Sequence, residues 1–203
     1  MLAISTSLEF ACATDASVVS GRICLDDVSL LDGGHRWLLA KIAAPLFQVL
    51  VLVVHGLDKI HGAEKIEEFW GAILKTLSLH SIVGEPVIAF VDGNCRICEG
   101  MDVGDICGSR LEAACKRTFV SDCLLSFCSR AGFSIANTFD EHVQAGASLG
   151  SYHVSSGMTV ACDYVLHSDT VAVVPGSLKM LENLKMDNKK ADHRPLSLSV
   201  GEV

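Results

Sequence analysis

The sequence has few aromatic residues and no excess of positive charge. Aromatic side chains make up 6% of its 203 residues, although half of the chain is hydrophobic. A chain this apolar is not disordered, and its core must be aliphatic. The net charge of −8 argues against a broad basic surface for a nucleic acid duplex. Any contact with nucleic acid is therefore small and local, or it has been lost, or the substrate is a small molecule.

The sequence also lacks a segment that could cross a membrane or direct secretion. Its longest apolar stretch, from Ile42 to Val54, contains Pro45 and Gln48 and is shorter than the roughly 20 residues of a membrane span. The first residues have no basic region followed by a long apolar stretch. Because the nine cysteines are odd in number and scattered, we expect reduced thiols and an intracellular location, in the nucleus or cytoplasm.

Apolar periodicity predicts one α/β domain over residues 1–203. An amphipathic helix is expected from Ala63, where apolar residues recur with helical spacing. Further helices are expected from Ser109 to Arg117 and, capped by Ser121, over Asp122–Arg130. Strands are expected at Leu2–Ser5, Ser17–Val19, Arg22–Leu25, Trp37–Ala44, Leu46–Val54, Val87–Val91, Phe133–Ala136, Ser151–Val154, Met158–His167, Val171–Val174 and Leu196–Val200.

Two of these strands are followed by polar residues that could take part in chemistry. Asp92, with Gly93 and Asn94, follows the strand that ends at Val91, and its carboxylate could activate water or bind a hard cation. Asn94 could contact phosphate or act as a ligand. The alternative is an ordinary turn, which favours the same residue types. His55 closes the preceding apolar run and could bind phosphate, although a histidine at a strand end is more often only a surface residue.

A carboxylate inside a third apolar run needs a partner. Asp163 lies within Val160–Leu166, where an unpaired buried carboxylate would be costly. His193 could bond to Asp163 and so keep a fixed tautomer, and its neighbour Asp192 supplies a further acid. The alternative is that Asp163 lies on the solvent face of an edge strand and that residues 192–193 belong to a polar loop.

Cysteine spacing gives little support for a structural zinc site. Cys95 and Cys98 form a Cys-x-x-Cys pair, and Cys107 follows. No fourth ligand stands at zinc-finger spacing, and no second pair of this kind is present in the sequence. We therefore predict no zinc finger here.

Together these motifs resemble the endonuclease/exonuclease/phosphatase superfamily of DNase I-like phosphoesterases, and especially retrotransposon-type endonuclease domains. The family's Gly-Asp-Phe-Asn-Ala motif stands here as Val91–Cys95, and its Arg-(Ile/Leu)-Asp-Tyr motif as Ala161–Tyr164. Its Ser-Asp-His-x-Pro motif stands as Ala191–Pro195, and His55 takes the place of a Tyr or His that follows a strand. The resemblance covers about residues 30–200.

The resemblance implies a two-sheet α/β sandwich with helices on the outside. The family's first motifs, an Asn at an early strand end and a Glu that is a principal metal ligand, have no counterpart in this sequence. We therefore expect the DNase I-like sandwich to be incomplete at its N-terminus. The site should lie at one end of the sandwich, where the loops after Val54, Val91, Leu149 and Lys190 converge.

The resemblance also implies Mg²⁺- or Mn²⁺-assisted attack of water on a phosphodiester in nucleic acid or on another phosphoester. In this reaction one carboxylate activates water, an oriented imidazole steadies the phosphate, and a second imidazole assists the leaving oxygen. The implied catalytic residues are His55, Asp92, Asn94, Asp163 and His193, and the implied metal ligands are Asp192 and Asn94. Because the Glu is missing, a catalytically inactive remnant and an unrelated α/β interaction protein are the alternatives.

Overall fold

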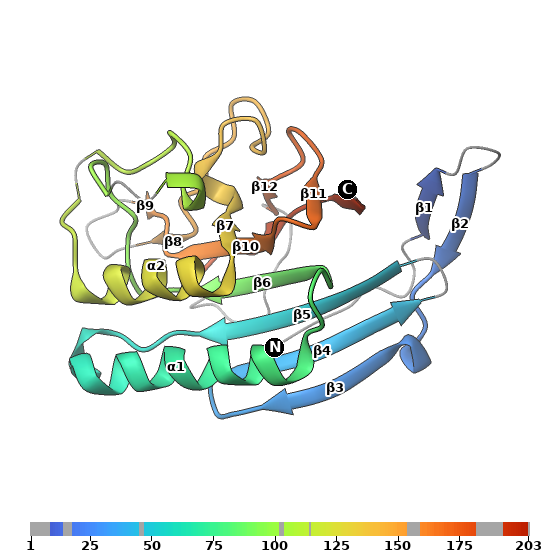
Figure 1. The fold of residues 1–203 in the computed structure, drawn as a ribbon. Coiled ribbons are helices and arrows are strands. Elements are labelled where there is room, and N and C mark those ends of the chain that lie inside the picture. The colour runs from blue at the N-terminus through green and yellow to red at the C-terminus, as the bar shows by residue number, and fades with distance from the viewer. Residues whose placement is uncertain are drawn as a thin grey trace.

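A six-stranded sheet with two helices on one face organises the chain (Figure 1). The structure is a computed structural model that describes residues 9–13, 18–44, 47–101, 104–113, 115–153, 159–181 and 193–202. The helices are α1 (Ala63–His80) and α2 (Phe119–Ala131). The strands are β1 (Glu9–Ala13), β2 (Val18–Arg22), β3 (Val28–Gly33), β4 (Trp37–Ala44), β5 (Phe47–His55), β6 (Val87–Asp92), β7 (Phe133–Ile135), β8 (Tyr152–His153), β9 (Thr159–Val160), β10 (Asp163–Ser168), β11 (Val171–Val173), β12 (Lys179–Met180), β13 (Leu196–Ser197) and β14 (Val200–Glu202).

The large sheet has the order β3-β4-β5-β6-β10-β7 and mixes parallel with antiparallel pairs. Strands β3, β4 and β5 form an antiparallel meander, and α1 then crosses over so that β6 runs parallel to β5. Strand β10 runs antiparallel to both β6 and β7. The remaining strands pair as small two-stranded sheets, β1-β2, β8-β9, β11-β14 and β12-β13. The expected α/β class is confirmed.

The helices cover one face of the large sheet because both are amphipathic. Alternate residues of β5, Leu50, Leu52 and Val54, point toward the helices and are buried with them. Trp70 of α1 and Phe127 of α2 contact each other with their ring centroids 4.8 Å apart, which joins the two helices. These aromatic rings pack in a core that is otherwise mainly aliphatic.

The opposite face of the sheet has a separate, smaller core. Val49 and Val51 of β5 and Val165 of β10 point to this side. They are buried by loop and strand residues from the C-terminal half of the chain, including Leu149 and Leu178. This face is the one on which a second layer packs in the expected sandwich, and the described residues supply that layer as loops and two-stranded sheets.

The described residues of 109–117 form no helix, so the helix expected there was wrong. This part of the chain pairs with the loop after β6: the backbone N–H of Glu112 donates to the carbonyl of Ile97 over 3.2 Å. An ion pair between Glu112 and Arg96 holds the same two segments together. Tertiary contacts thus override the local helix signal. The second helix is present, but Thr118 is its N-cap and Ser121 completes the capping box from the N3 position.

Several strand boundaries also differ from the prediction. The strand expected at Arg22–Leu25 ends at Arg22. The strand expected over Met158–His167 is divided into β9 and β10, and that over Leu196–Val200 into β13 and β14, because each half pairs with a different neighbour. The strand expected at Leu2–Ser5 lies outside the described residues.

Not all cysteines are reduced in the structure, contrary to the expectation. Cys98 and Cys115 form a disulfide with their Cα atoms 5.6 Å apart, so Cys98 cannot serve as a zinc ligand with Cys95. Free thiols with described side chains are Cys95, Cys107, Cys123, Cys128 and Cys162. Disulfides persist mainly in oxidising compartments, and the intracellular location stays a prediction. Within the described part of the chain, no helix is long and apolar enough to cross a membrane.

His167 should make the stability of the fold sensitive to acid. Burial, and secondarily the nearby His142, lower the pKa of His167 below its ordinary 6.5. The unfolded chain therefore gains a proton first as the pH falls, so stability is full above about pH 6.5 and decreases below it. A His167→Gln variant should lose less stability than the wild type between about pH 7.5 and about pH 5.5 in urea unfolding.

The matched control is His35→Gln, since His35 is exposed in a loop. This variant should keep the acid sensitivity of the wild type. An unchanged pH dependence in His167→Gln would contradict the assignment of the effect to His167.

Candidate active site

Three polar side chains form one row across three neighbouring strands. In the parallel pair β5–β6, His55 is in register with Asp92, and in the antiparallel pair β6–β10, Asp92 is in register with Asp163. Residues Val54, Val91 and Tyr164, adjacent in sequence to the three, are buried on the helix side. Because side chains alternate along a strand, His55, Asp92 and Asp163 all lie on the opposite face.

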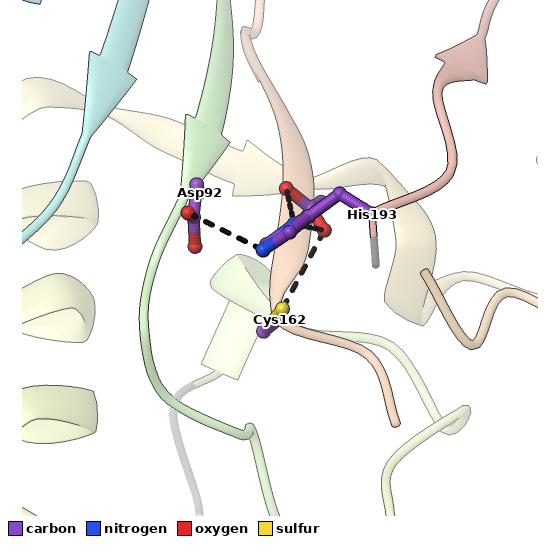
Figure 2. Close-up of side chains that lie close together, drawn as sticks. Asp92, Cys162 and His193 are labelled. Carbon is purple, nitrogen blue, oxygen red and sulfur yellow. Dashed lines mark hydrogen bonds and ion pairs between the residues drawn. The ribbon is translucent and has the colours of Figure 1, made fainter. Parts of the chain in front are cut away.

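The imidazole of His193 lies against this row. Its Nδ1 is 2.9 Å and 3.2 Å from the two carboxylate oxygens of Asp163, and its Nε2 is 3.9 Å from Oδ2 of Asp92. Figure 2 shows the side chains of Asp92 and His193 directed toward each other. His55 approaches from the other side, with its Nε2 3.6 Å from the same Asp92 oxygen. The predicted contact between Asp163 and His193 is confirmed, and its solvent-face alternative is excluded.

Ser151 holds the two segments that bring Asp163 and His193 together. Its buried hydroxyl accepts hydrogen bonds from the backbone N–H groups of Cys162 (3.4 Å) and Asp163 (3.2 Å). Its carbonyl accepts a 2.7 Å bond from the N–H of Arg194. Sequence reasoning missed Ser151, because a serine in a polar loop carries no signal until its partners are known.

Asn137 fixes the other side of β10. Its side-chain amide donates to the carbonyl of Asp163 over 3.1 Å, and its oxygen accepts a 2.7 Å bond from the N–H of Val165. The side chain thus replaces a neighbouring strand at the position where β10 begins. Nothing in the local sequence indicated this bridging role.

The Asp92-Gly93-Asn94 turn is built into the site. The Asp92 carboxylate accepts a 3.1 Å hydrogen bond from the backbone N–H of Asn94, whose φ of 48° is a left-handed conformation that asparagine tolerates. The Asn94 side-chain nitrogen donates to the carbonyl of Gly56 over 2.8 Å. The Gly56 N–H in turn donates to the Asp92 carbonyl over 2.7 Å, and a Cβ on Gly56 would lie 2.9 Å from that oxygen, which explains the glycine.

Burial and charge act together on Asp92. Its carboxylate is 18% exposed, and burial followed by the negative charge of Asp163 raises its pKa. The hydrogen bond from Asn94 and the nearby His193 and His55 oppose this shift. Burial and the same two carboxylates also raise the pKa of the Cys162 thiol. Two carboxylates that repel each other in a half-buried place provide a local excess of negative charge, which a bound cation would offset.

The row opens into a cavity of about 880 Å³ on the face of the sheet opposite the helices. Its walls include apolar side chains of the exposed sheet face, such as Leu38, Val53 and Phe90. Its basic lining residues are Arg36 and Arg194, and several histidines stand beside them. Two arginines therefore line the cavity together with the carboxylates of Asp92 and Asp163, although the net charge of the chain is −8.

The donor groups fit a divalent cation in part. The oxygens of Asp92 and Asp163 belong to a group of possible ligand atoms that lie within 4.8 Å of one another, together with Cys162 and His193. Carboxylates suit Mg²⁺ or Mn²⁺, and the side-chain oxygen of Asn94 could add to them. Asp192, the other predicted metal ligand, lies outside the described residues.

The structure brings together most of the predicted site residues. His55, Asp92, Asp163 and His193 converge, whereas Asn94 turns its amide nitrogen toward Gly56 rather than into the group. Cys162 is an additional residue of the site that sequence reasoning left out. It occupies the position next to Asp163, where an apolar residue is expected from the motif, and only the contacts show its place.

Comparison with solved structures identifies the fold. The chain matches the endonuclease domain of TRAS1, a telomere-specific non-LTR retrotransposon, with a TM-score of 0.58 at 13% identity over 95% of this chain and 79% of that one. It matches the Neisseria 3′ phosphatase NExo bound to a product DNA hairpin with a TM-score of 0.57 at 13% identity, over 91% and 74% of the two chains. It matches an AP endonuclease from Archaeoglobus fulgidus with a TM-score of 0.54 at 13% identity, over 84% and 68%.

The chain therefore has the endonuclease/exonuclease/phosphatase fold, and its structural neighbours include a retrotransposon endonuclease domain. At such low identity the likeness establishes the fold alone. No protein-family profile matches the sequence. No curated protein sequence matches it either.

Replacing Asn137 should destabilise the protein and loosen the start of β10. An Asn137→Ala variant leaves a partly buried carbonyl at Asp163 and a buried N–H at Val165 without their partner. Each such loss costs about 1–3 kcal/mol, so the free energy of unfolding should fall by about 2 to 6 kcal/mol in urea titration. Ser134→Ala on β7 removes an exposed bond to the carbonyl of Asp105 and should change it by less than about 0.5 kcal/mol. Equal effects of the two substitutions would contradict the bridging role.

Proposed function

We propose that this chain is a metal-dependent phosphodiester hydrolase of the endonuclease type. The observation that carries the proposal is the row His55–Asp92–Asp163, with His193 held against it at the mouth of a cavity. Hydrolysis of a phosphodiester by water requires a carboxylate, an imidazole oriented by a carboxylate, and a second imidazole. The fold supports the same class of reaction, since its neighbours include nucleases and a 3′ phosphatase.

Asp92 is proposed as the group that accepts the proton of the attacking water. It stands in the centre of the row, and burial and Asp163 raise its pKa. A base with a raised pKa holds a proton more strongly and is better matched to a reaction near neutral pH. The backbone bond from Asn94 keeps the carboxylate in place while it acts.

His193 is proposed to contact the phosphate and steady the charge that develops on it. Because Nδ1 faces Asp163, the ring is fixed with Nε2 toward Asp92 and the cavity. Asp163 is thus a positioning residue that orients the ring. Preorganised donors of this kind lower the barrier by stabilising charge in the transition state.

His55 is proposed to assist the leaving oxygen. Its side chain is 59% exposed at the end of β5, the most open place in the row. Asp92 lies between it and Asp163 in the sheet. An imidazole on the far side of the base from His193 can protonate the departing group without competing for the attacking water.

A divalent cation, Mg²⁺ or Mn²⁺, belongs to this proposal. Asp92 and the side-chain oxygen of Asn94 would hold it, and Asp192 stays a predicted ligand. When bound, the ion would offset negative charge on the phosphoryl group and make water easier to deprotonate. Its two positive charges also fit the excess of carboxylate charge between Asp92 and Asp163.

Nucleic acid is the proposed substrate, with other phosphoesters as the alternative class. Arg36 and Arg194 line the cavity beside His55 and His193, which gives a local basic rim for phosphates. The rest of the chain is acidic, so the contact covers only a few phosphates. A contact of this size agrees with the small and local nucleic-acid surface expected from the net charge of the sequence.

Removal of the oriented imidazole should abolish cleavage. In a plasmid-nicking assay with Mg²⁺, His193→Ala should cleave about 10²- to 10⁴-fold more slowly than the wild type, the usual contribution of a positioned acid–base group. His80→Ala, at the exposed end of α1, should cleave at the wild-type rate. No cleavage by the folded wild type would favour the inactive remnant, and equal cleavage by wild type and His193→Ala would remove the proposed role.

Magnesium binding should depend on Asp92. Calorimetric titration of the full chain should show a site of millimolar affinity or better, which Asp92→Asn weakens at least tenfold because it removes the charged ligand. Asp58→Asn, at the exposed start of a short 3₁₀ helix, is the matched control and should bind as the wild type does. Binding unaffected by Asp92→Asn would place the cation elsewhere.

A further inference from the structure

We propose that the same end of the sheet binds a zinc-class transition-metal ion through Asp92, Cys162 and His193, with Asp163 holding the imidazole. This binding shares Asp92 with the Mg²⁺ site of the hydrolase proposal, but it uses other ligands besides and does not require the chain to be a hydrolase. It rests on a sulfur donor that the proposed reaction does not use. Figure 2 shows the thiol of Cys162 beside the side chains of Asp92 and His193.

The distances between the donors are close to those of a coordinated ion. One ligand atom from each of Asp92, Cys162, Asp163 and His193 lies within 4.8 Å of the others. With bonds of about 2.0–2.3 Å and tetrahedral angles, ligand atoms stand roughly 3.5 Å apart. The widest separation therefore has to close by about 1 Å, which small side-chain rotations supply.

The types of donor atom favour zinc over magnesium. A thiolate and an imidazole are ligands of Zn²⁺, Co²⁺ and related ions, whereas Mg²⁺ prefers an all-oxygen shell. The contact between His193 and Asp163 is the carboxylate–histidine arrangement that commonly orients an imidazole on zinc. With Nδ1 turned to Asp163, Nε2 faces Asp92 and becomes the coordinating nitrogen.

The fold supplies these donors from separate segments that are already held in place. Asp92 ends β6, Cys162 precedes β10, and the hydroxyl of Ser151 binds the backbone N–H of Cys162. The Cys162 side chain is buried, with the residue 8% exposed, and the cavity provides access through Asp92 and His193. Among the described residues, no other group of three or more His, Cys, Asp or Glu side chains is arranged to hold a metal ion.

Charge and protons balance on binding. The Cys162 thiol donates to Oδ2 of Asp163 at 3.5 Å and therefore carries its proton before the ion enters. Coordination breaks the S–H bond, releases the proton to solvent and forms a sulfur–metal bond. The two charges of the ion are then matched by the Cys162 thiolate and the Asp92 carboxylate, and Asp163 remains paired with the imidazole.

Cobalt is a direct probe of this site, because Co²⁺ is coloured where Zn²⁺ is not. Titration of the full chain with Co²⁺ should produce a sulfur-to-cobalt charge-transfer band in the near ultraviolet and visible bands of a four-coordinate ion. Added Zn²⁺ should remove these bands. In Cys162→Ser the charge-transfer band should be lost, while Cys24→Ser, which changes an exposed thiol, should keep it.

Two further variants keep the test independent of any folding defect at Cys162. His193→Ala leaves the buried thiol in place and should weaken Co²⁺ binding at least tenfold. Asp163→Asn should weaken it about 10- to 100-fold while the charge-transfer band survives at saturation, as expected for a residue that orients a ligand. Circular dichroism confirms that each variant is folded.

The proposal is overturned if wild-type protein shows no sulfur-to-cobalt band at millimolar Co²⁺, or if the band persists in folded Cys162→Ser. Failure of nuclease activity does not bear on this result, since binding is read from the spectrum. Conversely, Cys162→Ser should still bind Mg²⁺ in the calorimetric titration, because its ligands are oxygens.

Discussion

The register of three strands is the constraint on which the whole site depends. The pairing of β5 with β6 and of β6 with β10 places His55, Asp92 and Asp163 in one row. A shift of one residue in either pair would move a member of the row to the helix side of the sheet. The buried residues next to the row oppose such a shift, since Val54, Val91 and Tyr164 would then leave the helix-side core.

The site also requires that His193, which is distant in sequence from His55 and Asp92, lie next to this row. Ser151 does this by accepting hydrogen bonds from backbone N–H groups: its hydroxyl accepts from Cys162 and Asp163, and its carbonyl accepts from Arg194. Asn137 fixes the opposite edge of the same strand. Rigid support of this kind lets a loop-borne imidazole keep a defined tautomer and direction. The site residues and the residues that hold them in place therefore form one structural unit. The proposed hydrolysis and the proposed zinc-class binding both use this unit.

Repulsion between Asp92 and Asp163 gives this unit its affinity for positive charge. Two carboxylates in a half-buried place are costly for folding unless something compensates them. His193 and His55 compensate in part. The two proposed uses of the site differ in Cys162. An ion that binds only oxygen ligands does not coordinate this thiol, whereas a zinc-class ion does.

Sequence patterns were sufficient wherever the signal was local and repeated. The amphipathic helix from Ala63, the strand before Asp92 and the pairing of Asp163 with His193 all followed from periodicity or from the cost of a buried charge. They failed at residues 109–117, where a disulfide and the Arg96–Glu112 ion pair decide the conformation. These contacts join residues whose local sequence gives no indication of each other.

The sequence by itself therefore determined the aliphatic core, the α/β alternation and the kinds of chemical group at the strand ends. Only the tertiary structure decided that these groups share one face, that Asn94 turns toward Gly56, and that a thiol from Cys162 stands among the carboxylates. The physical reason is that hydrophobic periodicity is written along the chain, whereas strand register and side-chain convergence arise from contacts between segments distant in sequence.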